Sequence, residues 1–400
     1  MRCKKQPLSA IAEINVEQYV SKEKWPHIQY LDTGNASRGR ILALQQLVSG
    51  IDKVPGRARR KVKDGSIVYS MVRPNQGHYA LLESPPADML VSTGFAVIDA
   101  KRDIVLPQYL YYALIRPEVT AYFQALAEQT VSTYPTLAKD DLAQFEINVP
   151  SLDDQRAASL LLASLDEKIE VNHCINDYLS ALVDLEFSKR FSNSVSTTSL
   201  ENVLAISTKS LKPQQHAGET WEHYSIPAFD EMHWPIFELA DGIKSNKYIV
   251  DRSSILISKL NPSTKRIWIP ACLTDKAVCS TEFIVYKPLE PRHKSFYCAA
   301  ISANSFTAFL LEHVTGSTGS RQRVQPKATL DYPMPNPCRM AIEAFCDFAD
   351  PIYRQIEINE IESQRLRSLR NALLPKLMSG EINVSKIELP TQPNNHLCAG

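Results

Sequence analysis

Positively charged side chains are concentrated in a few short segments of this chain. Six of the eleven residues from 53 to 63 are lysine or arginine, and none of the eleven is acidic. The basic residues in these segments are Lys53, Arg57, Arg59, Arg60, Lys61, Lys63, Lys259, Lys265, Arg266, Arg321, Arg323 and Lys327. Because clustered cations bind phosphate groups, their recurrence indicates contact with nucleic acid. A solvated loop is the alternative interpretation of any single cluster.

The overall charge balance by itself argues against a nucleic-acid-binding protein, since 44 lysines and arginines offset 44 aspartates and glutamates. The acidic residues, however, are concentrated elsewhere. Between residues 151 and 190, eight acidic residues outnumber four basic ones. The neutral total is therefore the sum of basic and acidic regions, and it does not exclude phosphate binding.

Motifs of common catalytic chemistry are absent. The chain contains no GxGxxG, GxxxxGK[ST], HExxH or GxSxG motif, so dinucleotide binding, P-loop hydrolysis, zinc proteolysis and hydrolase chemistry lack their usual residues. Only 261–263 (Asn-Pro-Ser) resembles a fragment of the amino-methyltransferase motif. The eight cysteines form no CxxC pair, which predicts reduced thiols in a cytoplasmic protein and no zinc site. We expect no catalysis, cofactor or metal in this chain.

Membrane insertion and export are not expected either. No apolar run approaches the roughly 18 to 20 residues of a membrane span. The basic start of the chain, 1–7, is not followed by an apolar region, as a signal peptide would require.

The chain contains an internal repeat with an offset of about 187 residues. The aligned blocks are 65–74 with 253–262, 92–97 with 280–285, and 169–172 with 356–359. Ordered blocks at nearly one offset make chance similarity a minor alternative. A chain of 400 residues also exceeds what one hydrophobic core usually organises. We therefore predict two homologous domains related by an internal pseudo-twofold axis.

Each repeat is predicted to be α+β. Segments rich in β-branched and aromatic residues, which favour strands, are 66–72, 93–98, 254–258 and 281–286. Apolar residues at helical spacing predict helices over 108–128 and 294–313, with a kink at Pro117 in the first.

A long helix is predicted to end each repeat, because apolar residues there recur at three- and four-residue intervals, as in the seam of a coiled coil. The predicted seam residues are Leu165, Ile169, Asn172, Leu179, Leu182, Ile352, Ile356, Asn359, Leu366 and Leu369. Asn172 and Asn359 occupy equivalent positions, where a buried amide selects one register. Packing of each helix on its own domain is the alternative.

This arrangement resembles the specificity subunit of a Type I restriction-modification system. The segment 316–319 (Gly-Ser-Thr-Gly), followed by 335–337 (Pro-Asn-Pro), resembles the end of a target-recognition domain in that family. Its counterparts in the first repeat are 130–137 and 147–150, and 373–382 resembles the end of the family's second helix. The resemblance covers about residues 8 to 385.

The resemblance implies two α+β target-recognition domains, at 1–150 and 193–338. It also implies two spacer helices, at 151–192 and 339–380, which pack as an antiparallel coiled coil. The remaining residues, 381–400, are rich in Pro, Gln and Asn and are expected to form a disordered tail.

The resemblance further implies a non-catalytic subunit that reads a bipartite target in double-stranded DNA, one half with each domain. The helices would fix the gap between the halves and dock two modification subunits, which supply adenine methyltransferase activity and S-adenosylmethionine. Restriction subunits would supply ATP- and Mg²⁺-dependent translocation and cleavage. The alternative from the residues themselves is a two-domain coiled-coil scaffold between proteins, without DNA specificity.

Charge and position in turns select the candidate DNA contacts. They are Arg57, Arg59, Arg60, Ser70, Arg73, Asn75, Lys259, Asn261, Lys265, Arg266, Arg321 and Arg323. Basic side chains would hold the phosphate backbone, and a few Arg, Asn or Ser groups at loop ends would read base edges.

Overall fold

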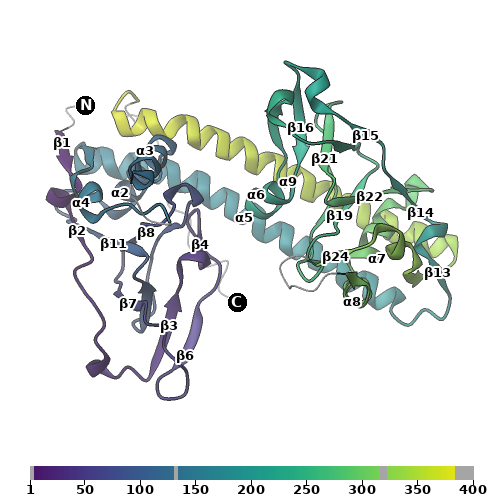
Figure 1. Ribbon diagram of the computed structural model, residues 1–400, viewed down its shortest axis with the longest axis horizontal. Coiled ribbons are helices and arrows are strands. Elements are labelled where there is room, and N and C mark those ends of the chain that lie inside the picture. Colours follow the sequence, from purple (N-terminus) through teal and green to yellow (C-terminus); the bar gives the residue numbers. More distant parts are fainter. Residues whose placement is uncertain (1–3, 130–133, 316–321, 383–400) are drawn as a thin grey trace. The chain divides into compact units, whose positions relative to one another are not determined.

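The computed structural model describes residues 4–129, 134–315 and 322–382. In these ranges, none of the helices is both long and apolar enough to cross a lipid bilayer. The chain divides into two compact units, one of residues 1–168 with 366–400, the other of residues 169–365. The divisions fall inside two long helices, so each unit combines one globular α+β part with segments of both helices (Figure 1).

The first unit contains two four-stranded sheets, ordered β6-β3-β10-β7 and β2-β11-β8-β9, and the short pairs β1-β12 and β4-β5. Its strands are β1 (Lys4–Pro7), β2 (Ala12–Ile14), β3 (His27–Leu31), β4 (Ala36–Ser37), β5 (Arg40–Ile41), β6 (Gln45–Val48), β7 (Ala58–Lys61), β8 (Ile67–Ser70), β9 (Tyr79–Leu81), β10 (Met89–Ser92), β11 (Phe95–Ala100) and β12 (Glu146–Val149). Its helices are α1 (Leu8–Ile11), α2 (Pro107–Leu114), α3 (Pro117–Glu128), α4 (Lys139–Gln144) and the beginning of α5 (Leu152–Phe191).

The second unit repeats this plan with sheets ordered β14-β22-β19-β20 and β15-β18-β21-β16-β17. Its strands are β13 (Thr197–Ser199), β14 (Leu204–Ser207), β15 (Ser210–Leu211), β16 (Thr220–Tyr224), β17 (Ile236–Leu239), β18 (Lys247–Ile249), β19 (Ile255–Ser258), β20 (Ile267–Trp268), β21 (Ala277–Ser280), β22 (Phe283–Pro288), β23 (Val314–Thr315), β24 (Arg323–Val324) and β25 (Pro333–Pro335). Its helices are α6 (Ile226–Met232), α7 (Lys294–Ser302), α8 (Asn304–Glu312) and most of α9 (Arg339–Ser379).

One sheet in the first unit is buried on both faces. Along β8, Ile67 and Tyr69 join a core with the helices, whereas Val68 joins a core with the other sheet. This alternation follows from the two-residue period of a strand. In the second unit Ile255 and Leu256 of β19 divide in the same way. The predicted α+β architecture and its duplication are therefore confirmed.

The helices after β11 and β22 differ from their prediction. Each was expected as one helix, but each is a pair, α2 with α3 and α7 with α8. The break falls at Arg116 and at Ala303, where the backbone is extended with ψ of 138° and 146°. Pro117 accounts for the first break. No proline lies near Ala303, so the prediction of a continuous second helix was wrong, and the repeated fold imposes the break.

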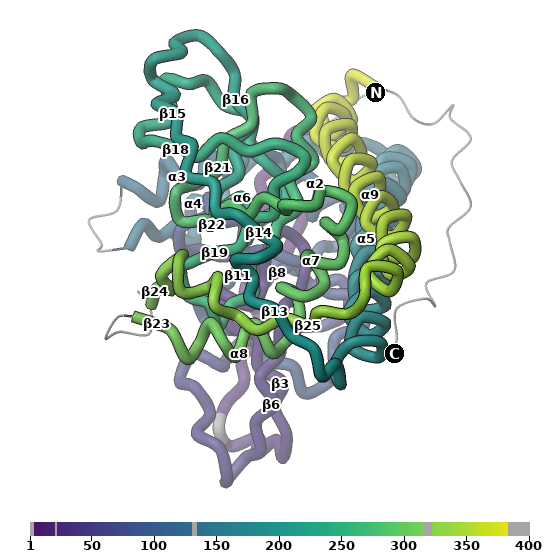
Figure 2. The backbone as a smooth tube through the Cα atoms, turned by 90° about the vertical axis from the view of Figure 1, so that its right-hand side faces the viewer, coloured from purple at the N-terminus to yellow at the C-terminus, as the bar shows by residue number. Residues whose placement is uncertain are grey.

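The two long helices run antiparallel within each unit. In the second unit the ring of Phe191 near the end of α5 lies 5.7 Å from that of Phe345 near the start of α9. In the first unit Arg370, late in α9, forms an ion pair with Asp166 of α5. Figure 2 shows α5 and α9 side by side. The helices contain 40 and 41 residues.

Candidate nucleic-acid interface

The densest positive charge lies around the start of β7. Arg57 and Arg59 are exposed, and Arg60 is half-buried. The Arg59 Nε donates a hydrogen bond to the Gly56 carbonyl oxygen at 3.0 Å, and Arg60 Nη2 donates to the Thr93 carbonyl oxygen at 3.1 Å. Burial lowers the pKa of Arg60, but a guanidinium group stays charged at neutral pH. These arginines therefore present positive charge beside the Thr93 backbone.

Some cations of the basic segment 53–63 form ion pairs with carboxylates, and others form none within the described ranges. Lys61 Nζ lies 2.6 Å from a Glu23 carboxylate oxygen, and Lys63 Nζ lies 3.6 Å from Asp99. In the part of the chain that the structure describes, Arg57, Arg59 and Arg60 form no ion pair with a carboxylate. The unpaired arginines are the better candidates for binding phosphate.

The turn after β8 holds the next group of predicted contacts. The buried Ser70 hydroxyl donates to the Val72 carbonyl oxygen at 2.8 Å, so Ser70 shapes the turn from inside. Arg73 has a left-handed backbone conformation with φ of 48°, and its backbone N–H donates to the Pro135 carbonyl oxygen at 2.9 Å. The exposed Arg73 guanidinium lies 5.0 Å from the centre of the Tyr134 ring. This turn therefore presents a cation to solvent.

Asn75 is exposed two residues later in the same turn. Its backbone N–H donates to the Gln124 side-chain oxygen at 3.2 Å. The β8–β9 turn is thereby fixed to α3 while the Asn75 side chain stays exposed.

The turn between β10 and β11 connects these segments. The Thr93 N–H donates to the Arg57 carbonyl oxygen at 2.9 Å, and the Met71 N–H donates to the Gly94 carbonyl oxygen at 2.9 Å. A Cβ atom at position 94 would lie only 2.8 Å from the Thr33 side chain. The arginines before β7, the turn after β8 and the chain after β3 therefore meet at one place.

Sequence reasoning missed two exposed arginines in this region, Arg38 and Arg40. They belong to the hairpin formed by β4 and β5, whose Arg38 N–H donates to the Gly77 carbonyl oxygen at 2.7 Å. Their spacing around Gly39 is a hairpin signal, but two isolated arginines do not make a dense cluster. We call the set Arg38, Arg40, Arg57, Arg59, Arg60 and Arg73 the arginine face of the first unit.

The second unit builds the equivalent turn with the same backbone. The Ser258 hydroxyl donates to the Leu260 carbonyl oxygen at 2.9 Å, as Ser70 does in the first unit. Asn261 has φ of 48°, and its N–H donates to the Gln322 carbonyl oxygen at 2.8 Å. The Asn261 Oδ1 is buried, with no hydrogen-bond partner in the described part of the chain. The repeat therefore preserves the turn and changes the side chain that occupies its left-handed position.

Most of the predicted basic contacts in the second unit are neutralised by carboxylates. Arg266 forms two hydrogen bonds with Asp230, at 2.6 and 2.9 Å, and its side chain is only 12% exposed. Arg323 lies 3.1 Å from Glu282.

The other basic candidates of this unit differ from one another. Lys265 lies 3.4 Å from the Asp184 carboxylate. Lys259 is half-buried and has no ion pair within the described ranges. Arg321 lies outside the described residues, as do 316–319 and part of 130–137. Among the predicted basic contacts that the structure describes, Lys259 is the one in the second unit without an ion pair, whereas the first unit has Arg57, Arg59 and Arg60.

An ion pair supports the strand before each turn. In the first unit the Ser66 hydroxyl donates to Asp99 Oδ1 at 2.6 Å, and Lys63 Nζ lies 3.6 Å from Asp99 Oδ2. The cation comes from the chain before β8, and the carboxylate comes from β11.

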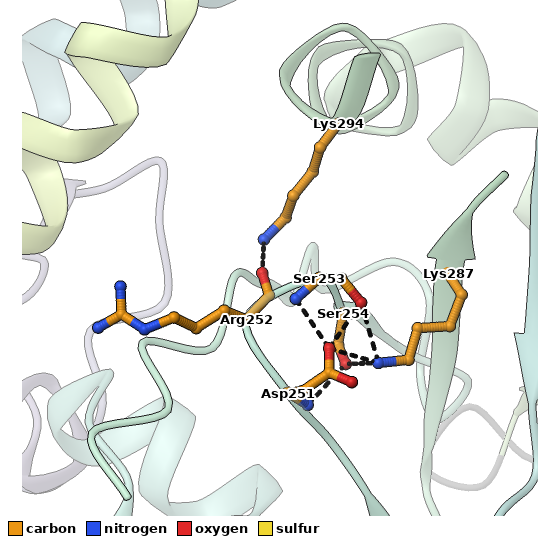
Figure 3. A network of polar contacts seen from close by, with 6 residues as sticks. All are labelled: Asp251, Arg252, Ser253, Ser254, Lys287 and Lys294. Carbon is orange, nitrogen blue, oxygen red and sulfur yellow. Dashed lines mark hydrogen bonds and ion pairs between the residues drawn. The ribbon is translucent and has the colours of Figure 1, made fainter. Parts of the chain in front are cut away.

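The second unit contains the same support with the charges exchanged, and Figure 3 shows the residues of this second support. Lys287 of β22 donates to Ser254 Oγ at 2.7 Å, and its Nζ lies 2.6 Å from Asp251. Burial alone raises the pKa of Asp251, but hydrogen bonds from Lys287 and Ser253 outweigh it and hold that pKa at about 2. The ion pair is therefore kept in both units, but the cation and the carboxylate have exchanged positions.

The paired helices carry a buried polar cluster in the second unit. Asn172 and Asn359 are both buried. Asn172 Nδ2 donates to Glu362 at 2.8 Å and to the Ser363 hydroxyl at 3.2 Å, and Asn359 Nδ2 donates to Asn176 at 2.8 Å. These bonds are satisfied in one alignment of the helices, which favours that register.

The predicted seam needs correction at two positions. Leu182 and Leu369 are 44% and 48% exposed, and Val183 is fully buried beside Leu182. Ile169 is buried as expected. The half-buried members of the predicted set are Leu165, Leu179, Ile352, Ile356 and Leu366. Counting apolar residues at helical spacing selected a mixture of two stripes on α5, because both have the same spacing.

The comparisons with known proteins agree with this architecture. The family described as "Type I restriction modification DNA specificity domain" matches residues 6–181. The specificity subunit of the type I restriction enzyme HindI from Haemophilus influenzae is 30% identical over 177 residues, which are 44% of this chain and 38% of that protein. The MjaIX specificity subunit from Methanocaldococcus jannaschii is 24% identical over 353 residues, covering 78% of this chain and 76% of that protein.

Among solved structures, the S subunit of a type I restriction-modification system from M. genitalium is similar, with a TM-score of 0.55. Its sequence identity is 15%, and the match covers 94% of this chain and 96% of that one. At this identity the likeness establishes a shared fold. The sequence of residues 6–181 thus matches the DNA specificity domain of type I restriction-modification systems, and the chain shares the fold of a solved S subunit.

Proposed function

We propose that this chain is the non-catalytic, DNA-reading subunit of a type I restriction-modification complex. Residues 1–150 and 193–338 each read one half of a bipartite target in double-stranded DNA. The helices of residues 151–192 and 339–380 fix the gap between the halves. The observation that carries this proposal is the duplicated turn after β8 and β19, because it holds different side chains in one backbone frame.

Reading two different half-sites requires such a frame. Phosphate contacts position a protein on the duplex, and contacts to base edges specify the sequence. In the first unit the turn presents Arg73, and arginine binds the O6 and N7 atoms of guanine with two hydrogen bonds. In the second unit the same position holds Asn261. The arginines before β7 supply the phosphate contacts around the first turn.

The long helices provide a surface for the modification subunits. On α5, exposed apolar residues recur at intervals of four, three, four and three, which marks one face of a helix. They are Val171, Ile175, Tyr178, Leu182 and Leu185. Ile358 and Leu369 of α9, at positions equivalent to Val171 and Leu182, are also exposed. An exposed stripe of this kind fits a partner helix, and its partial repetition supports two modification subunits.

The partners supply the chemistry in this proposal. The modification subunits bring the adenine methyltransferase and S-adenosylmethionine, and the restriction subunits bring ATP- and Mg²⁺-dependent translocation and cleavage. The complex acts on DNA in the cytoplasm. This chain contributes the choice of sequence and the spacing of the two half-sites.

Sequencing of adenine methylation in host DNA tests the proposal directly. Deletion of the gene should abolish methylation at one split motif with a fixed gap, and the wild-type gene should restore it. A gene carrying Arg73→Ala should fail to restore methylation at the original motif. Arg156→Ala, which removes an exposed arginine from α5, is the matched control and should restore it. Unchanged methylation after deletion, in cells that express the modification subunit, would contradict the proposal.

A further inference from the structure

The hairpin of β4 and β5 is a short, rigid element of the first unit (β4 in Figure 1). Ala36 pairs with Ile41, and Ser37 pairs with Arg40. The two turn residues between them, Arg38 and Gly39, have positive φ angles of 48° and 95°, as in the type I′ turn that matches the twist of a hairpin. The hairpin therefore has a defined backbone.

A two-stranded hairpin is only marginally stable alone, and this one is fixed to the strand behind it. The Arg38 N–H donates to Gly77 O at 2.7 Å, and the Gly39 N–H donates to Tyr79 O at 2.9 Å. His78 Nδ1 lies 2.6 Å from the Ala36 carbonyl oxygen. These contacts come from β4 and from the turn, so they fix the hairpin to residues 77–79.

The side chains on this hairpin combine positive charge with exposed apolar surface. Arg38 and Arg40 are exposed. Ile41 and the next residue, Leu42, are 38% and 61% exposed. Single exposed apolar residues are ordinary, but here two adjoin the two arginines that an anchored turn contributes to the arginine face. Positive charge matches a phosphate backbone, and apolar side chains beside it match the stacked bases between the phosphates.

We propose that the Ala36–Leu42 hairpin is a wedge that kinks duplex DNA. Arg38 and Arg40 bind phosphates on either side of the minor groove, and Ile41 and Leu42 enter a base step and partly unstack it. The wedge operates in the half-site read by the first unit. This inference rests on the proposed DNA-reading function and adds a deformation of the DNA to it.

The test uses the full chain with its modification subunit and a duplex carrying the motif found by methylation sequencing. 2-Aminopurine, whose fluorescence rises when it unstacks, replaces adenines one at a time across the first half-site and its flanks. Binding of the wild-type complex should raise the fluorescence at one step. Ile41→Ala with Leu42→Ala should return it to the value of free DNA and weaken binding by about tenfold, near the low end of the cost of one lost base-pair contact.

Ile51→Ala is the matched control, because Ile51 is 82% exposed in another loop of the same unit. It should leave both the fluorescence rise and the affinity unchanged. The two substituted side chains of the test variant are exposed, so its thermal unfolding should match that of the wild type. A fluorescence rise that persists in the Ile41→Ala, Leu42→Ala variant overturns the wedge.

Two further outcomes separate the wedge from the proposed function. Specific binding by the wild type with no fluorescence rise at any step overturns the wedge and leaves the proposed function intact. Loss of modification-subunit binding in the double variant, with the rise kept, also overturns the wedge and assigns the hairpin to a protein contact. Absence of specific DNA binding by the wild-type complex contradicts the proposed function itself.

Discussion

The two units connect one equivalent pair of strands with different structural elements. In the first, β3 is parallel to β10 and antiparallel to β6. In the second, β16 is parallel to β21 and antiparallel to β17. The chain from β3 to β6 forms the exposed arginine hairpin, whereas the chain from β16 to β17 forms α6. Equivalent sheets therefore carry unlike insertions at the same place.

Local sequence accounts for that difference. Arg38-Gly39 provides the two positive φ angles of a tight hairpin. In the second unit, Ser225 caps α6 by accepting a hydrogen bond from the Ala228 N–H at 3.2 Å, and Pro227 lies in its first turn. The sheets thus form a common frame, and short insertions determine what each unit exposes.

The insertions also change the electrostatics. α6 places Asp230 against Arg266, so the second unit neutralises a cation that the repeat had placed near its turn. The first unit exposes Arg38 and Arg40 on its hairpin, and within the described ranges its Arg57, Arg59 and Arg60 form no ion pair with a carboxylate. We infer that the first unit contributes more of the phosphate contact and that the second relies more on shape and on base contacts.

The largest expected effect follows from that difference. Arg59→Ala with Arg60→Ala should weaken DNA binding by ten- to a hundredfold and reduce the slope of log affinity against log salt by up to about two, since each phosphate contact contributes about 0.9. Fluorescence anisotropy over a series of salt concentrations measures both. Lys139→Ala with Arg156→Ala removes the same charge from α4 and α5 and should change the slope little. Equal slopes for the first pair and the wild type would remove the β7 segment from the interface.

A second prediction concerns the hairpin itself. Gly39 has φ of 95°, and a Cβ atom there would lie 2.6 Å from the Tyr111 hydroxyl oxygen. Gly39→Ala should therefore lower the free energy of unfolding by about 2 kcal/mol, through backbone strain and steric overlap. Gly50→Ala, with φ of 87° and open space around it, should cost only about 1 kcal/mol. Urea unfolding of the two variants measures the difference, and equal losses would show that Tyr111 does not restrain the hairpin.

The fold was largely predictable from the sequence because the same pattern of strand and helix signals occurs in both repeats. A serine in the same place of each strand, Ser70 and Ser258, forms the same hydrogen bond in both turns. Runs of β-branched and aromatic residues located β8 and β19, because both strands are buried on both faces. A strand that packs on each side has a continuous apolar run, which the sequence shows directly.

The site was less predictable, because pairing between distant residues has no local signal. Nothing near Arg266 in the sequence indicates that Asp230 neutralises it. The prediction of the seam residues was partly wrong for a related reason. α5 carries one buried and one exposed apolar stripe, and spacing alone does not show that Val183 is buried while Leu182 is exposed. Tertiary contacts decide both cases.

A third prediction sharpens the contrast between the units. Asp230→Asn with Glu282→Gln should free Arg266 and Arg323 from their carboxylates and add positive charge to the second unit. DNA binding should strengthen by about threefold and its salt slope should steepen, because loss of the two carboxylate charges raises the positive potential that attracts phosphate. The same anisotropy series measures this. Weaker binding would show that these carboxylates take part in recognition.

The smallest effect concerns the exchanged ion pair. The pKa of Asp251 is about 2 in the folded protein, against an ordinary value of 3.8. The stabilisation from the ionised carboxylate is therefore complete above about pH 4 and is lost as the pH falls toward 2. Since the Asp251 side chain is 65% exposed, solvent screening keeps this contribution below about 1 kcal/mol.

In the wild type, the Asp251 carboxylate takes up a proton when the protein unfolds between about pH 4 and pH 2, because its pKa is lower in the folded state. Asp251→Asn removes this proton uptake, so the free energy of unfolding of the variant should depend less on pH in that range. Asp241→Asn, at an exposed position nearby in sequence, is the matched control and should leave the profile unchanged. Urea unfolding at half-unit pH intervals measures the three profiles. Identical acid profiles for Asp251→Asn and the wild type would mean that Lys287 holds the strand through Ser254 alone, and that the exchange of charges between the units has no energetic consequence.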